Sequence, residues 1–75
     1  MSAPQPTVEA LMYSLRSRGT KALQEPATQR RLFALSDDQV IEVGNRLQRL
    51  KPHIARAWSV QEVEALFQAR TREYG

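Results

Sequence analysis

Two short stretches with the same pattern, LSDDQV at positions 35–40 and WSVQEV at positions 58–63, constrain the fold of this chain most strongly. In each, a serine is followed three residues later by Gln or Glu, which is the capping box that begins an α-helix, and apolar residues occupy the two positions of a hydrophobic staple. Such reciprocal capping satisfies backbone donors that a helix start leaves unpaired. Helices are therefore expected to begin just after Ser36 and at Val60.

A first helix is expected near the N-terminus, because apolar residues recur there at helical spacing. Thr7 can cap a helix that runs from about Val8 to Arg18, and Gly19 supplies the left-handed stop. Residues 1–6, with two prolines, a serine and a glutamine, are typical of a disordered leader. The domain prediction is thus a leader at 1–6 followed by a single helical domain at 7–75.

Two further prolines place the remaining boundaries. Pro26 suits the first position of a second helix, and Pro52 requires the third helix to end by about Leu50 or Lys51. No segment alternates with period two, so strands are not expected. The predicted fold is all-α, a small bundle of four helices with short connections, with room for an extra helical turn at residues 20–24.

The predicted core follows from the apolar stripes of these helices. The residues expected to point inward are Val8, Leu11, Met12, Leu15, Leu32, Phe33, Leu35, Val40, Val43, Leu47, Leu50, Val60, Val63, Leu66, Phe67 and Tyr74. Gly44 interrupts the third helix at a cost of about 1 kcal/mol relative to alanine, which indicates close approach of a backbone, from a neighbouring helix or from an external partner.

The chemistry of an enzyme is not expected in this chain. It has one histidine, no cysteine and three scattered glycines, so it offers no nucleophile with a base, no thiolate metal site and no phosphate-binding loop. His53 lies in a connector, where a structural or solvated role and a pH-sensitive contact are both open. We therefore expect a non-enzymatic protein without catalytic residues, cofactor or metal. The absence of a long apolar run and of a secretory signal predicts a cytoplasmic protein rather than a membrane protein.

A nucleic-acid partner is one alternative, because 11 basic residues face 8 acidic ones and the excess lies in the N-terminal half. The candidate phosphate-binding residues are Arg16, Arg18, Lys21, Arg30 and Arg31. Residues 26–51 also fit a helix-turn-helix. However, the N-terminal end of the third helix, which would enter the major groove, carries Asp37, Asp38 and Glu42, which phosphates would repel.

A protein partner is the favoured alternative, because several apolar residues lie off the predicted stripes. Tyr13 falls on the polar side of the first helix, Ile41 lies about 100° from the stripe of the third, and Trp58 lies in a connector, where a staple with Val63 would also explain it. Tyrosine, tryptophan and arginine are the types enriched at interface hot spots. The candidate partner-binding residues are Tyr13, Arg16, Arg30, Arg31, Ile41 and Arg46. Association into a homodimer is also open.

Two resemblances bear on the setting. The run WSVQEVEAL at 58–66 resembles the opening of a Myb or SANT repeat, although the spaced tryptophans of such repeats are absent and no function is carried over. The segment from Glu9 to Val40 is similar to small proteins of bacterial prophages and other integrated mobile elements. That resemblance implies a small repressor, an inhibitor of host defence or an antiactivator. The predicted function is thus a protein-binding adaptor, inhibitor or antiactivator, with a DNA-binding helical regulator as the alternative.

Overall fold

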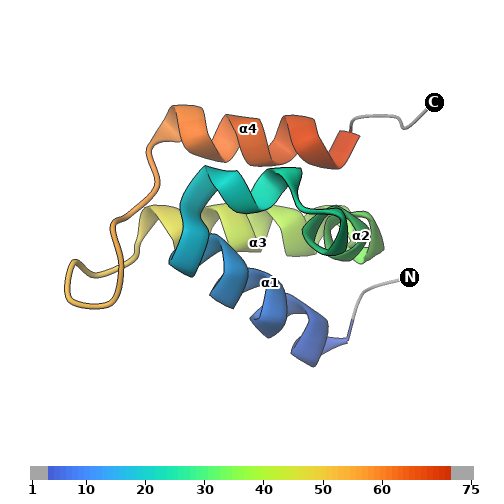
Figure 1. The fold of residues 1–75 in the computed structure, drawn as a ribbon, viewed down its shortest axis with the longest axis horizontal. Helices are drawn as coiled ribbons and strands as arrows, with labels where there is room; N and C mark the ends of the chain where they lie inside the picture. The colour runs from blue at the N-terminus through green and yellow to red at the C-terminus, as the bar shows by residue number, and fades with distance from the viewer. Residues whose placement is uncertain (1–3, 72–75) are drawn as a thin grey trace.

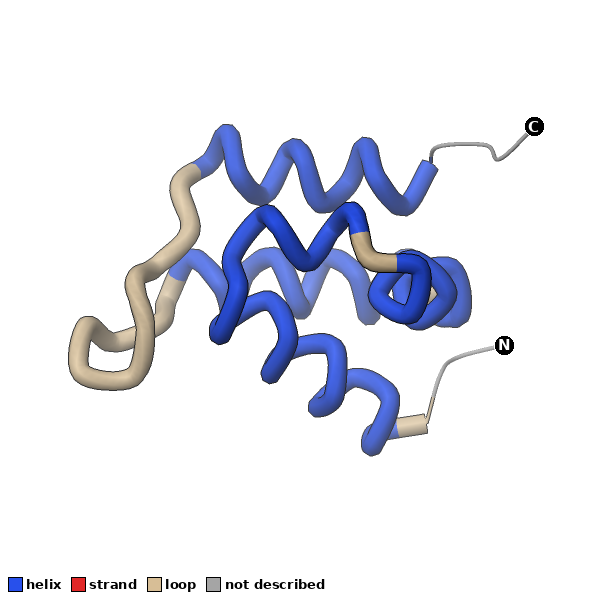
Figure 2. The backbone as a smooth tube through the Cα atoms, in the orientation of Figure 1, coloured by secondary structure: helices blue, strands red, loops and turns tan. Residues whose placement is uncertain are grey.

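The computed structural model of the chain describes residues 4–71, all of them in helices or connections, with no strand in that range. The elements in order are α1 (Gln5–Arg18), the short 3₁₀ helix η1 (Gly19–Gln24), α2 (Pro26–Ala34), α3 (Asp37–Gln48) and α4 (Val60–Thr71). α3 and α4 run antiparallel beside each other, α1 and η1 lie against them, and α2 crosses one end of the bundle (Figure 1, Figure 2). The predicted all-α bundle is confirmed.

Both predicted capping boxes are present. In α3, the Ser36 hydroxyl accepts from the Gln39 backbone N–H at 3.2 Å and the Gln39 side chain accepts from the Ser36 N–H at 3.0 Å. In α4, the Ser59 hydroxyl accepts from the Glu62 N–H at 3.2 Å and the Glu62 carboxylate accepts from the Ser59 N–H at 2.9 Å. The starts of α3 and α4 therefore lie where local capping chemistry places them.

The predicted start of α1 at Val8 is wrong, because the helix begins at Gln5. Pro4 takes the N-cap position without a side-chain cap, and its carbonyl accepts from the Thr7 N–H at 3.0 Å, so Thr7 lies inside the first turn and does not cap. Pro6 is tolerated there because the first turn needs no N–H from it. Gln5 and Pro6, which we assigned to the leader, are therefore helical, and residues 1–3 lie outside the described range.

The other boundaries lie close to their predicted positions. Gly19 has a positive φ of 63° at the end of α1 and donates its N–H to the Leu15 carbonyl. The turn predicted at 20–24 is η1, and Pro26 is the first residue of α2. α3 ends at Gln48, slightly earlier than Pro52 alone requires.

The core lies between the helices and is built mainly from leucine and valine. The buried apolar residues are Val8, Leu11, Met12, Leu15, Ala22, Leu23, Leu32, Leu35, Val40, Val43, Leu47, Trp58, Val63, Leu66 and Ala69. Leu50 packs against this cluster and is partly buried. Tyr74, the last predicted member, falls outside the part of the chain that the structure describes.

Three residues that we predicted in the core are exposed: Phe33 (46%), Val60 (63%) and Phe67 (37%). In α4 the buried stripe is centred on Leu66, so Val60 and Phe67 fall roughly 100–120° away from its centre. In α2 the buried side chains are those of Thr28 and Leu32, and Phe33 is turned about 100° from Leu32. The two helices thus bury narrower strips than their apolar residues suggested.

The connector between α3 and α4 contains a turn that begins at Pro52. The Ile54 N–H donates to the Lys51 carbonyl at 2.8 Å, which closes a turn over residues 52–54. Trp58 is buried, and its backbone N–H donates to the Leu47 carbonyl at 2.9 Å. Trp58 is therefore a core residue, and its alternative role as a contact for a partner is wrong. Within residues 4–71, none of the helices has the length and apolar character needed to cross a membrane.

Candidate partner-binding surface

Two of the six predicted contact residues lie together on the outer face of α3. Ile41 is 51% exposed, as its position off the buried stripe predicts, and it lines a hollow on that face together with Arg46. The Arg46 guanidinium reaches across to α1, where it lies 3.3 Å from the Glu9 carboxylate. Arg46 therefore joins α3 to α1 and is already occupied by an ion pair.

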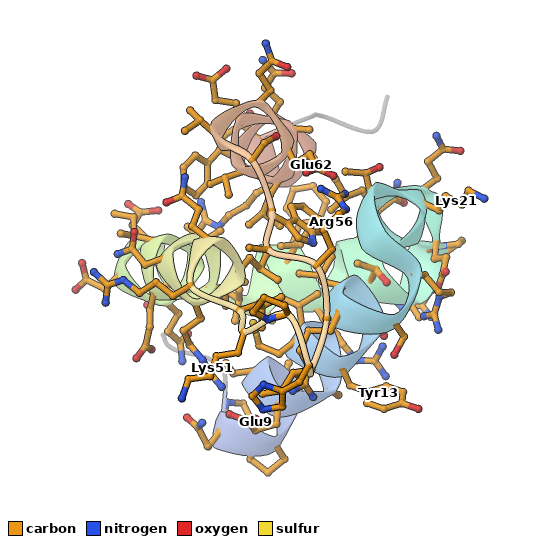
Figure 3. The ribbon with its side chains drawn as sticks, turned by 90° about the vertical axis from the view of Figure 1, so that its left-hand side faces the viewer. Glu9, Tyr13, Lys21, Lys51, Arg56 and Glu62 are labelled. Carbon is orange, nitrogen blue, oxygen red and sulfur yellow. The ribbon has the colours of Figure 1, made fainter. Side chains whose placement is uncertain are left out.

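The remaining four predicted residues lie elsewhere and in two groups. Tyr13 and Arg16 are exposed on α1, and Tyr13 projects on the side away from α3 (Figure 3). Arg30 and Arg31 of α2 line a separate hollow together with Thr7 at the start of α1. Since Thr7 and Arg16 are nine residues apart on one helix, about 14 Å of helix length separates these two places. The six residues do not form one site.

The alternative phosphate-binding set is divided in the same way. Arg18 is engaged by Glu25, with its Nη2 at 2.8 Å and its Nε at 2.5 Å from the two carboxylate oxygens. This hydrogen-bonded contact raises the pKa of Arg18 above its ordinary value. Lys21 projects from η1 on the side of the molecule opposite α3 (Figure 3). Arg30 and Arg31 share one hollow, whereas Lys21 lines a different one and Arg16 lines neither.

The last turn of α4 contacts the acidic start of α3, although the Asp37 side chain stays 87% exposed. The Arg70 side chain lies 3.0 Å from the Asp37 carboxylate, and its Nη2 donates to the Leu35 carbonyl at 2.7 Å. Arg70 thus binds the turn between α2 and α3 from outside. A helix-turn-helix would have to present this same end of α3 to DNA. That end is exposed in the structure, with Arg70 of α4 beside it, and it carries the Asp37, Asp38 and Glu42 carboxylates, which phosphates would repel.

An exposed apolar surface lies between α3 and α4, and we call it the Ile41–Phe67 surface after its two large side chains. These line one open hollow of about 420 Å³, whose other walls are Asp37, Val40, Arg70 and Thr71. The sequence indicated Ile41 but not Phe67, because Phe67 was assigned to the core. The signal that could have found it is Gly44, which predicted a close approach on this flank of α3.

At Gly44, side chains of α4 pack closely on α3. A Cβ placed on Gly44 would lie 3.0 Å from Val63 Cγ1 and 3.1 Å from Phe67 Cζ. The approach therefore comes from a neighbouring helix of the same chain, as one of the two explanations held, but the atoms nearest to Gly44 belong to side chains and not to the predicted backbone. Because Gly44 has no side chain, the Phe67 ring can lie against α3 beside Ile41. The glycine is therefore required for the shape of the Ile41–Phe67 surface.

Ion pairs use some carboxylates of the described residues and leave others free. The four that are paired are Glu9, Glu25, Asp37 and Glu62. The Glu62 carboxylate receives two hydrogen bonds from Arg56 and one from the Ser59 N–H, which together lower its pKa to about 2 (Figure 3). Three carboxylates, Asp38, Glu42 and Glu64, have no ion pair within residues 4–71. All three belong to α3 or α4.

The fold and this surface define a small all-α bundle with an apolar surface between its last two helices. Across residues 4–71, no group of three or more His, Asp or Glu side chains is arranged to hold a metal ion, and His53 is exposed in the connector. Comparison of the chain with protein-family models, with curated proteins and with solved structures finds no match.

Proposed function

We propose that this chain is a non-enzymatic protein that binds a protein partner through the Ile41–Phe67 surface and acts as an adaptor, inhibitor or antiactivator. The supporting observation is that two large apolar side chains from different helices, both substantially exposed, share one hollow. Single exposed apolar residues are common on protein surfaces, whereas contiguous ones mark sites of interaction. We propose that a prophage or another mobile element encodes this protein and that the protein acts in the host cytoplasm. The similarity of residues 9–40 to proteins of such elements supports this setting.

The expected contribution of this surface can be estimated from its exposure. Burying a whole Ile or Phe side chain is worth about 1.5–3 kcal/mol. Ile41 and Phe67 are about half and a third exposed, so covering both would contribute on the order of 2 kcal/mol. Each side chain would thus contribute about 1 kcal/mol, which is enough for a polar substitution to weaken binding measurably.

The test is affinity capture with matched isoleucine variants. The tagged full chain and two variants, Ile41→Ser and Ile54→Ser, are incubated with a nuclease-treated lysate of cells that express the chain naturally. Ile54 is 54% exposed in the connector and outside the hollow, so it controls for loss of an exposed isoleucine. We expect a stoichiometric protein to be retained by the natural chain and by Ile54→Ser but lost from Ile41→Ser. Binding must then be reproduced with the purified partner. Equal retention by both variants would refute the proposal.

Binding to a nucleic-acid backbone is a second candidate, favoured by the ion pairs of the N-terminal half. Both acids between residues 4 and 34 are paired. Four cations of the same segment have no ion pair with any described residue. They are Arg16, Lys21, Arg30 and Arg31. A gel shift with duplex DNA that weakens steeply with salt and is lost in the double variant Arg30→Ala/Arg31→Ala would favour this candidate.

A further inference from the structure

We infer that the partner segment covering the Ile41–Phe67 surface is an amphipathic helix whose apolar stripe is flanked by lysine or arginine. This inference rests on the proposed function and adds the chemistry of the partner. It is carried by two observations: the apolar surface lies along two antiparallel helices, and the carboxylates left without ion pairs lie on those same helices.

The shape of the surface suits a helix. Val60 and Phe67 are seven residues apart on α4 and so lie on the same side of it, with about 10 Å between them along the axis. Both are exposed, and Ile41 of α3 lies beside Phe67 in the shared hollow. The exposed apolar groups therefore form a strip that runs along α4 from Val60 to Phe67 and meets α3 at Ile41. A helix laid into such a strip would contact it with residues spaced i, i+3 or i+4, and i+7.

The charges beside the strip determine which charged residues are favoured on either side of the partner helix's apolar stripe. Asp38 and Glu42 lie on the outer face of α3 and line a hollow with Ile41, while Glu64 is one turn before Phe67 on α4. All three carboxylates are exposed and free of ion pairs in the described range. Arg49, near the far end of α3, is the cation on this face that has no ion pair among residues 4–71.

The groups without ion pairs beside the strip are thus three carboxylates and one guanidinium, since Arg46 and Arg70 are paired with Glu9 and Asp37, although the whole chain carries a net charge of +3. Opposite charges on the partner would be attracted, and acidic flanks would be repelled. A second copy of this chain placed symmetrically on the same surface would bring these carboxylates towards their equivalents, which disfavours self-association there.

The experiment uses the full chain labelled with ¹⁵N and two designed peptides of about 16 residues, long enough to form a helix on binding. Both peptides carry leucines at i, i+4 and i+7. One has lysines at the flanking positions and the other has glutamates. Amide chemical shifts are followed during titration at low and at moderate salt. We expect the lysine peptide to shift amides around Ile41 and Phe67 and to bind about tenfold more tightly than the glutamate peptide, with the preference shrinking as salt rises.

Matched variants then test the role of the carboxylates. Glu64→Gln should weaken binding of the lysine peptide about threefold, the scale of one partly screened surface charge. Glu25→Gln makes the same chemical change and the same change in net charge at a carboxylate that is paired with Arg18 and lines neither hollow, and it should leave binding unchanged. Circular dichroism of both variants establishes that they are folded.

Several outcomes would overturn the inference. These are equal or tighter binding of the glutamate peptide, no binding of either peptide, shifts confined to α1 and α2, or equal effects of Glu64→Gln and Glu25→Gln. If the labelled chain sediments as a dimer, and the dimer forms through Ile41 and Phe67, a second copy covers the surface and the inference also fails. The proposed function is judged separately: if Ile41→Ser abolishes capture while the lysine peptide shows no preference, protein binding stands and the cationic helix does not.

Discussion

Gly44 gives the sharpest test of the packing beneath the Ile41–Phe67 surface. Replacing a helical glycine with alanine normally stabilises a helix by about 1 kcal/mol. Here the added methyl would lie 3.0 Å from Val63 Cγ1 and 3.1 Å from the Phe67 ring, closer than ordinary van der Waals contact. Phe67 is partly exposed and can swing outward, but Val63 is backed by the core. Overpacking costs about 1–3 kcal/mol, so we expect Gly44→Ala to lower the free energy of unfolding by about 1 kcal/mol.

A double-mutant cycle identifies the cause of that loss. Val63→Ala removes two buried methyl groups and should by itself cost about 2 kcal/mol. In that background the methyl of Ala at position 44 enters the vacated space, so the second substitution should become neutral or stabilising. The expected coupling between the two sites is about 1–2 kcal/mol.

The assay is urea unfolding of the four proteins, followed by circular dichroism at the helical signal and analysed by linear extrapolation. The whole chain should unfold with about 4–11 kcal/mol, so changes of 1 kcal/mol are measurable. Asn45→Ala, at the exposed neighbouring position, is the control and should change stability by a few tenths of a kcal/mol. The reasoning is refuted if Gly44→Ala stabilises the natural chain, or if the two single changes add without coupling.

Three further predictions concern capping, pH and a buried hydroxyl. Ser36→Ala removes the cap of α3 and should cost about 1 kcal/mol in urea unfolding. Glu62→Gln can keep the hydrogen bond to Ser59 but loses the ion pair with Arg56, and because Arg56 is largely exposed we expect a cost of about 1 kcal/mol at neutral pH. Since the pKa of Glu62 is lowered to about 2 from an ordinary value of 4.5, its carboxylate stabilises the fold fully above pH 4.5. The difference in free energy of unfolding between the natural chain and Glu62→Gln should therefore shrink as pH falls towards 2. Thr28→Val should raise stability by about 1 kcal/mol, because the buried Thr28 hydroxyl has no hydrogen-bond partner among the described residues.

Each of these has a control and an outcome that contradicts it. Ser17→Ala, at an exposed serine within α1, should leave stability unchanged or slightly higher, so an equal loss there would remove the capping explanation for Ser36. For Glu62, a cost that persists unchanged at pH 2 would show that the charged carboxylate is not its source. For Thr28, a loss of stability in the valine variant would mean that the hydroxyl makes a favourable interaction.

The helix starts could be predicted from the sequence because their causes are local. The boxes at Ser36 and Ser59 and the proline at position 26 act within one helical turn, and all three boundaries are confirmed. The start of α1 was missed because Thr7 is a favourable cap residue, whereas Pro4 has no side chain that can cap. The backbone instead enters the helix at Gln5, with Pro4 before it. Where two local signals compete, the sequence alone does not decide between them.

Which side of each helix is buried is decided by contacts between residues that are far apart in the sequence. Leu66 and Phe67 are adjacent and both apolar, yet only Leu66 is enclosed, because α4 settles against Gly44 of α3. The partner of Arg46 is likewise Glu9, which lies on another helix. The exposure of Ile41 followed from the helical wheel of α3 alone. The exposure of Phe67, its neighbour across the hollow, could be recognised only once α3 and α4 were placed together.

The connector offers a practical consequence. Its C-terminal end is anchored by the buried Trp58, and its turn at residues 52–54 projects from the end of the bundle opposite the start of α3 (Figure 1). Exposed loop tips of this kind accept added groups readily, and the anchor at Trp58 shields the core from strain in the loop. A fluorophore or an epitope tag attached at His53 would therefore report on the chain while leaving the line between α3 and α4 unobstructed.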